Sequence, residues 1–218
     1  MITQLNSLTA FCPALANVFE CSQQLSWRMA ASPLPLGPIQ AAPVLPQVEA
    51  KLMELLAGLS LADWEQQTIV PNWRVRHVAA HLLDTSLRKL SMVRDGFVID
   101  RPRSNAPEEV RAFVDRVNAE GVAVYGRLSP TVLRMLMEPA SHDACAYHLS
   151  LDPFAPAAFA VSWAGDEESL NWFDTARELT ERWHHQEQIR LALGRPSIMI
   201  RELYHPVLDC FLRVLPDA

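Results

Sequence analysis

The chain has 218 residues, and its 19 basic and 25 acidic side chains give a formal net charge of −6. Half of its residues are apolar, which is typical of a soluble globular protein, and the length excludes a large multidomain assembly. No run of Lys or Arg is present, so we expect no binding to nucleic acid. No apolar stretch reaches the roughly 18 residues that cross a bilayer, and the start lacks the positive flank of a signal peptide. We therefore expect a cytoplasmic protein with no membrane partner.

The cysteine and glycine contents narrow the fold class. The four cysteines are scattered along the chain, which indicates reduced thiols rather than a disulfide framework. Only seven glycines are present, and neither a G-x-G-x-x-G nor a Walker pattern occurs. This composition disfavours an all-β fold and a phosphate-binding loop, and it favours helices.

The N-terminal 40 residues differ from the rest of the chain. Residues 1–28 contain no Lys, and a cluster of prolines between Pro33 and Pro46 follows them. Each proline fixes φ and removes a backbone donor, so this cluster predicts a linker. We interpret residues 1–40 as a Pro-rich extension. For residues 1–28 three alternatives stay open: a docked helix, an arm that binds a partner subunit of a homo-oligomer, or a disordered segment produced by a start codon upstream of Met29.

Residues 41–218 contain the helical patterns, in which apolar residues recur at spacings of three and four. Gly58, Gly96 and Gly194 follow three of these patterns as stop signals. The stretch 141–168 contains Pro153 and Pro156, and we interpret it as an irregular excursion. The sequence thus predicts an all-α antiparallel bundle whose sites project from facing helices. The predicted helices span residues 48–57, a turn from Leu61 to Trp64, 73–95, 108–128, 130–137, 171–193 and 202–214.

Two of these helices carry a polar stripe opposite an apolar face, at about 100° per residue. Such a stripe is either a solvated surface or the inward face of a polar site. On the second helix, Glu181 and His185 lie one turn apart and can converge, and His81 of the first helix would supply a third donor. Two imidazoles and one carboxylate with open positions are typical of a catalytic zinc site. The stripes comprise His77, His81, Asp84 and Arg88, and then Asp174, Glu178, Glu181, His185 and Gln188.

A second set of potential ligands lies at His142, Cys145 and His148, spaced by three residues after Pro139. One thiol and two histidines have no fourth partner nearby, so we interpret them as loop residues. His184 is interpreted as a packing residue. Trp73 and Trp183 either wall a cleft or belong to the core.

Two segments resemble one known family, the mycothiol-dependent maleylpyruvate isomerase family of the DinB-like superfamily. PNWRVRHVAAHLLDTSLRKLS is similar to its first metal-ligand helix, and VSWAGDEESLNWFDTARELTERWHHQEQIRLALGRP is similar to its second. RLSPTVLRML and HPVLDCFLRVLP also resemble this family, so the likeness covers roughly residues 40–216.

The resemblance implies a DinB-like bundle of four main helices over residues 41–218. It implies a divalent metal, usually zinc, on His81, Glu181 and His185, and a low-molecular-weight thiol such as mycothiol as cofactor. A metal-bound thiolate would attack a small electrophilic substrate. His77 stands where relatives commonly have an acidic residue, and many relatives continue beyond the position of Ala218 into a small α/β domain.

The chemistry of an open metal site leaves several functions possible. The first is a thiol-dependent isomerase or S-transferase, and the second is a hydrolase in which Asp84 or Glu178 acts as the base. Arg88 and Arg182 are candidates to bind a substrate carboxylate, and Asp84 is also a candidate to orient His81. A non-enzymatic binding or regulatory module is the third alternative.

Overall fold

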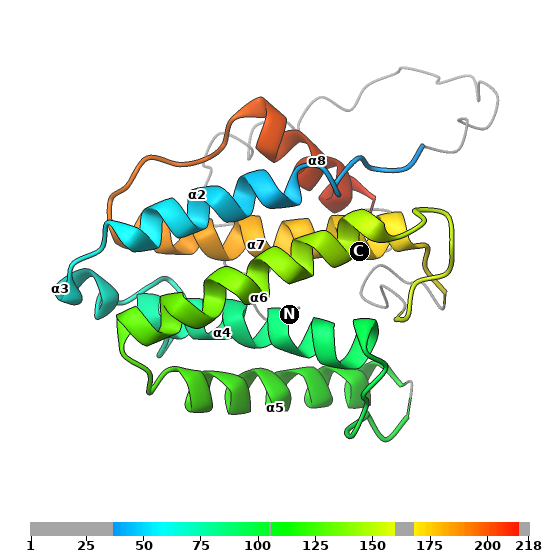
Figure 1. The fold of residues 1–218 in the computed structure, drawn as a ribbon, viewed down its shortest axis with the longest axis horizontal. Coiled ribbons are helices and arrows are strands. Elements are labelled where there is room, and N and C mark those ends of the chain that lie inside the picture. Colours follow the sequence, from blue (N-terminus) through cyan, green and yellow to red (C-terminus); the bar gives the residue numbers. More distant parts are fainter. Residues whose placement is uncertain (1–36, 105, 160–167, 214–218) are drawn as a thin grey trace, which may run out of the picture. The chain divides into compact units, whose positions relative to one another are not determined.

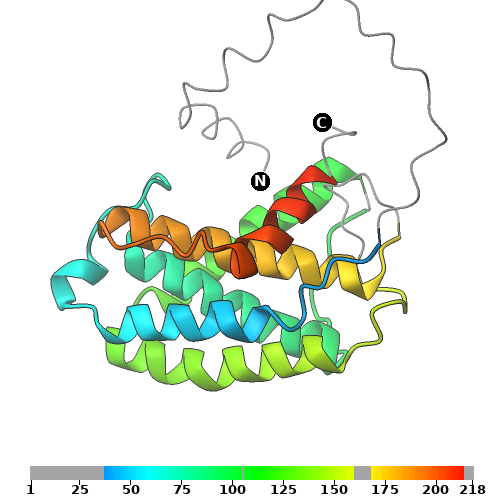
Figure 2. The ribbon, with the colours of Figure 1, turned by 90° about the horizontal axis from the view of Figure 1, so that it is seen from above.

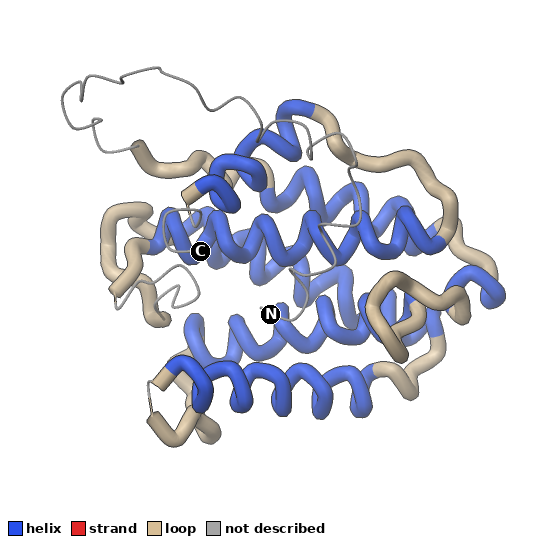
Figure 3. The backbone as a smooth tube through the Cα atoms, turned by 180° about the vertical axis from the view of Figure 1, so that it is seen from behind, coloured by secondary structure: helices blue, strands red, loops and turns tan. Residues whose placement is uncertain are grey.

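A computed structural model of the chain describes residues 37–104, 106–159 and 168–213. These residues form seven α-helices and one π-helical turn, and no β-strand occurs among them (Figure 3). The predicted all-α class is therefore confirmed. Residues 1–36 of the predicted extension lie outside the described residues, and Pro38 opens the compact unit that contains all of these helices.

The helices begin and end close to the predicted positions. Ser60 starts the second helix with a capping box, in which its Oγ accepts from the backbone N–H of Asp63 at 3.2 Å. Gly96 and Gly194 adopt φ values of 67° and 59° just beyond two helices, as helix-stopping glycines commonly do. In chain order the elements are α2 (Leu45–Ala57), α3 (Leu61–Trp64), α4 (Val75–Lys89), the π-helix η3 (Leu90–Arg94), α5 (Pro107–Tyr125), α6 (Pro130–Ser150), α7 (Asn171–Ala192) and α8 (Arg201–Leu212).

Helix α6 corrects one prediction. The sequence predicted a helix that stops at Met137 and an irregular stretch from Ser141, but α6 continues through Pro139 to Ser150. Proline removes one helix hydrogen bond, and Pro139 lies on the exposed face, where water can bind the freed carbonyl. The opposite face buries apolar residues on both sides of Pro139, so packing favours a continuous helix. Residues 151–159 are irregular, as predicted.

Four helices form the centre of the bundle. Helix α2 packs against α6 and α7, and α4 packs against the same two helices, so the four close a ring. In Figure 1, α2 and α7 run in one direction while α4 and α6 run in the other. Helix α5 covers α4, and α8 lies against α7 (Figure 2). No helix in the described part of the chain is long and apolar enough to cross a membrane.

The interior of the ring holds ion pairs as well as apolar residues. Arg182 of α7 is only 1% exposed. Its Nε–H donates to Glu178 Oε1 at 3.0 Å and its Nη1–H to Glu49 Oε2 of α2 at 2.7 Å. Its Nη2–H donates to Ser86 Oγ of α4 at 3.0 Å, so one guanidinium connects three helices. Buried charges need such compensation, because desolvation makes an unpaired one costly.

A second buried ion pair fixes the register of α4 and α7. Lys89 Nζ at the end of α4 donates to Asp174 Oδ2 near the start of α7 at 2.9 Å. The end of one helix thus meets the start of the other, which is the antiparallel arrangement. Of the α4 stripe, His81 faces the α7 stripe inside the bundle. The solvated-surface interpretation is wrong for the members of both stripes that are buried, which are His81, Asp84, Asp174, Glu178, His185 and Gln188.

Removal of Arg182 should destabilise the bundle strongly. Arg182→Leu leaves Glu49 buried without its cation, and we expect a loss of about 3 to 5 kcal/mol in the free energy of unfolding. Urea denaturation measures it. Arg111→Leu, at an exposed position of α5, is the matched control and should change the same free energy by about 0.5 kcal/mol or less. Equal losses in both variants would contradict the structural role of Arg182.

Candidate metal centre

The turn before α4 sets the geometry of the site. Thr68 Oγ1 and Gln67 Nε2 both donate to the backbone carbonyl of Trp73, at 2.7 and 2.9 Å. Asn72 adopts a left-handed φ of 65°, which asparagine tolerates better than most residues. This turn holds the half-buried indole of Trp73 over α4. Its ring centroid lies 5.2 Å from that of His81 and 6.2 Å from that of His185.

His77 has a structural role at the start of α4. Its Nδ1 accepts a hydrogen bond from the backbone N–H of Arg74 at 3.0 Å. It occupies the third helical position, where an acidic or amide side chain usually completes a capping box. The polar character of this position is therefore explained by helix capping, and His77 has no contact with the cluster described next.

Three side chains from α4 and α7 converge beside Trp73. Glu181 Oε1 lies 2.9 Å from His81 Nε2 and 3.1 Å from His185 Nε2. One potential ligand atom from each residue lies within 4.8 Å of the others, which makes this the cluster in the described residues best suited to hold a metal ion. Both imidazoles are buried, whereas the Glu181 side chain is 22% exposed, so solvent reaches the cluster at this carboxylate.

The tautomer of His185 is set by Gln188. The Nδ1 of His185 lies 2.8 Å from Gln188 Oε1, while Gln188 Nε2 lies 2.8 Å from His184 Nε2. Since the amide nitrogen can only donate, its oxygen accepts the Nδ1 proton of His185. The Nε2 of neutral His185 then presents a lone pair to the Glu181 carboxylate. Two acceptors this close need a positive group between them, either a proton or a cation.

The electrostatics favour one positive charge in this cluster. Burial alone would raise the pKa of Glu181, but His185 and His81 hold it well below its usual value. Burial also disfavours the protonated form of His185, yet the adjacent carboxylate outweighs it and raises the pKa of His185. For His81, burial dominates and lowers the pKa. The donor set of one carboxylate and two imidazoles fits a divalent cation such as zinc, with positions left open.

Asp84 and Arg88 lie on the same stripe of α4 but face α5. Arg88 Nε–H donates to Asp84 Oδ2 at 2.7 Å, and its Nη2–H donates to Asn118 Oδ1 at 2.6 Å. Asp84 packs so closely on Gly121 that a Cβ there would lie 2.2 Å from the Asp84 carboxyl carbon. The Nδ1 of His81 has no hydrogen-bond partner within the described residues, so Asp84 does not orient it.

The other sequence candidates are separated from the cluster. Arg182 and Glu178 belong to the buried ion pairs, which leaves no room for a substrate carboxylate at Arg182. Trp183 lies in the core against Tyr204, with ring centroids 5.0 Å apart, so of the two tryptophans only Trp73 borders the site.

His142, Cys145 and His148 lie on a helix, which corrects their interpretation as loop residues. They do not converge, because His142 is exposed while Cys145 and His148 are buried. His148 Nδ1 pairs with Thr175 Oγ1 at 3.0 Å, and burial lowers the pKa of His148 to about 4. The sequence pattern places Gln188 on the polar stripe and assigns it no separate role, although its spacing of three residues from His185 puts both on one helix face.

The family model described as the mycothiol maleylpyruvate isomerase N-terminal domain matches residues 45–190. The chain belongs to this family. The matched range begins with α2 and includes all three residues of the cluster. No curated protein matches the chain.

Two solved structures share this fold. The mycothiol-dependent maleylpyruvate isomerase is 14% identical with a TM-score of 0.56, and a His-to-Ala mutant of it is 13% identical with a TM-score of 0.57. In both comparisons, 80% of this chain and 68% of the other chain are covered. The family and the DinB-like bundle predicted from the sequence are confirmed.

Gln188 should control how tightly this cluster binds a cation. Gln188→Leu removes the acceptor for the Nδ1 proton of His185, and partners of this kind typically contribute about 10- to 100-fold in metal affinity. We expect that loss in a zinc competition assay with a chelator. The ¹⁵N shifts of the metal-free variant should also show His185 leaving the Nδ1–H tautomer.

Two further variants test the cause of this loss. Gln188→Glu keeps an acceptor and should retain most of the zinc affinity. Gln66→Leu, an exposed position, should leave both the affinity and the ¹⁵N shifts of His185 unchanged. Unchanged shifts in Gln188→Leu would contradict the role assigned to Gln188.

Proposed function

We propose that the protein is a zinc-dependent enzyme that uses a low-molecular-weight thiol, such as mycothiol, to isomerise or transfer a small electrophilic substrate. The observation that carries this proposal is the convergence of His81, Glu181 and His185 on one point. Membership of the maleylpyruvate isomerase family supports the activity class, and the two solved relatives are described as mycothiol-dependent. Residues 41–218 would form the catalytic bundle.

Each residue of the cluster contributes a separate property. His81 and His185 would supply neutral nitrogen donors, and the ionised Glu181 would supply one negative charge. A divalent cation held by this set keeps a net positive charge and stabilises the thiolate form of a thiol against its protonated form. Gln188 keeps the Nδ1 proton of His185 in place, so that Nε2 faces the cluster. The Trp73 indole covers both imidazoles and excludes water from that side.

A hydrolase on the same bundle has less support. Hydrolysis needs a general base beside the bound water. Asp84 binds Arg88 at 2.7 Å, and Glu178 binds Arg182 at 3.0 Å, so neither candidate base is available to the cluster. A binding module without metal would have no need for a buried imidazole held in one tautomer. The thiol-dependent reaction does not require a general base from the protein beside the cluster.

Metal content tests the site. Protein purified without a metal-affinity tag should contain about one zinc per chain by elemental analysis, as single-site zinc enzymes do. His81→Ala, Glu181→Ala and His185→Ala should each lose the metal and keep the helical circular-dichroism spectrum. His142→Ala, which replaces an exposed histidine on α6, is the control and should keep the metal. Retention of the metal in the three cluster variants would overturn the ligand assignment.

Thiol dependence tests the activity. We expect the zinc-loaded protein to convert maleylpyruvate or a related small electrophile only when mycothiol is added. Glu181→Gln should lower the turnover at least about 100-fold, because the charge and geometry of the cluster both change. Turnover without thiol would favour the hydrolase. Absence of turnover in a protein that still binds zinc would reject the activity and leave the metal site intact.

A further inference from the structure

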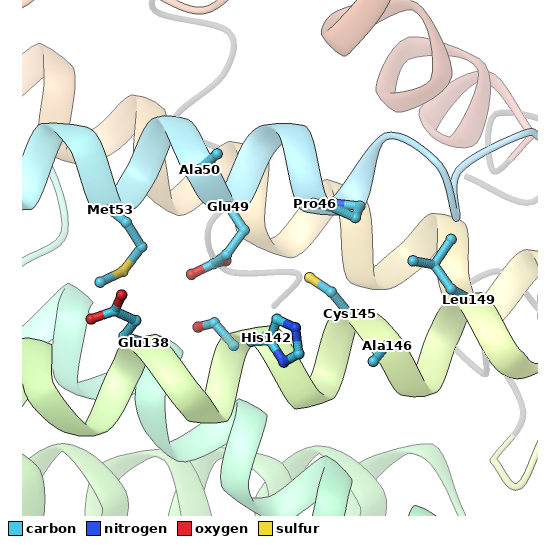
Figure 4. Close-up of a pocket in the computed structure, with 10 residues that line it drawn as sticks. Pro46, Glu49, Ala50, Met53, Glu138, His142, Cys145, Ala146 and Leu149 are labelled. Atoms are coloured by element: carbon cyan, nitrogen blue, oxygen red, sulfur yellow. The ribbon is translucent and has the colours of Figure 1, made fainter.

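A second site is indicated by a groove between α2 and α6. The groove has a volume of about 330 Å³, at the small end of the range for ligand pockets. None of the three residues of the metal-centre cluster lines it. Its walls are largely apolar and come from both helices, with Ala50 and Met53 on α2 and Ala146 and Leu149 on α6 (Figure 4).

Two polar atoms at the bottom of this groove lack partners. The Oε1 of Glu49 and the Oγ of Ser141 are both buried, and neither has a hydrogen-bond partner among the described residues. Glu49 is 6% exposed and Ser141 is 2% exposed. The Glu49 carboxylate is directed from α2 towards α6 in Figure 4. Its other oxygen, Oε2, accepts from Arg182, so only Oε1 remains for a further donor.

An unpaired carboxylate oxygen in such a place is costly. A buried acceptor without a donor destabilises the folded state, and the more so when it is charged. Arg182 is shared between Glu49 and Glu178, and Glu178 also pairs with Arg177 at 3.4 Å. Arg182 engages only the Oε2 of Glu49, so it leaves Oε1 without a donor. A donor that enters the groove and reaches both Glu49 Oε1 and Ser141 Oγ would remove this cost on both helices.

The charges around the groove favour a cation. Two acids, Glu49 and Glu138, line it, while neither Lys nor Arg does. The exposed His142 lines it as well, with its Nδ1 3.3 Å from Asp143 Oδ1. Cys145 also lines the groove and stays neutral, because burial raises the pKa of its thiol to about 11. An ammonium group carries three donors and a positive charge, which match two acceptors and an acidic lining.

We propose that this groove binds a small primary alkylammonium. Its head group would donate to Glu49 Oε1 and Ser141 Oγ, and its short alkyl chain would lie along Cys145 and Ala146. The residues of this site differ from those of the metal centre. A negative result for alkylammonium binding therefore does not bear on the thiol-dependent activity, and the reverse also holds.

Titration of the full-length protein with n-butylammonium tests the site. Methionine methyl groups labelled with ¹³C report it by NMR, because Met53 lies on the groove wall. We expect a saturable shift of the Met53 signal. The neutral n-butanol, which has the same alkyl chain, should bind at least about tenfold more weakly, since a charged hydrogen bond contributes about 1.5 to 3 kcal/mol. Equal affinity for butanol, or no saturable shift, would overturn the proposal.

Variants locate the binding. Glu49→Gln should weaken butylammonium binding about tenfold or more, whereas Glu54→Gln, an exposed position on the same helix, should leave it unchanged. Ala146→Phe should block the groove from its exposed rim and abolish the Met53 shift without touching the contact between Glu49 and Arg182. Ala146→Phe keeps the test valid if Glu49→Gln unfolds. Binding in Ala146→Phe that equals the wild type would place the ligand elsewhere and overturn the proposal.

Discussion

The buried guanidinium of Arg182 holds three helices of the bundle together. It connects α7 to Glu49 of α2 and to Ser86 of α4. Because neighbouring residues of a helix point about 100° apart round its axis, fixing Arg182 also fixes the direction of the preceding residue, Glu181. The ion pair of Lys89 and Asp174 holds α4 and α7 together at a second point. The ion pairs therefore determine where the carboxylate of α7 meets the imidazole of α4.

Much of this arrangement could be predicted from the sequence, because helix periodicity and the spacing of Glu181 and His185 are local properties. The apolar repeats of α4 and α7 and the glycines beyond them define the helices. The convergence of Glu181 and His185 follows from one helical turn. Whether the polar stripes face solvent or the interior could not be predicted in this way. That depends on charges far apart in the sequence, such as Glu49 and Arg182, which compensate one another only once the helices pack.

The features that the sequence did not predict have physical reasons of the same kind. Pro139 is a helix breaker by local rules, yet the apolar residues that α6 buries on either side of it stabilise the continuous helix. Arg88 and Arg182 differ little as residues in a sequence, and only packing shows that Asn118 and Glu49 already occupy their donors. Gln188 matters because of the side-chain amide orientation that His184 imposes on it. These hydrogen-bond and ion-pair partners are determined by how the helices pack, so they leave no periodic signal in the sequence.

The two imidazoles of the cluster are held very differently, and this has a consequence for how a cation would enter and leave. His185 is fixed through Gln188, whereas the Nδ1 of His81 has no hydrogen-bond partner in the part of the chain that the structure describes. A cation would therefore find a prepared pair on α7 first and recruit the ring of α4 last. Once bound, it would tie together two segments that are 100 residues apart in the chain. Unfolding would then require its release, so the concentration of free cation would act as a control on the lifetime of the folded protein.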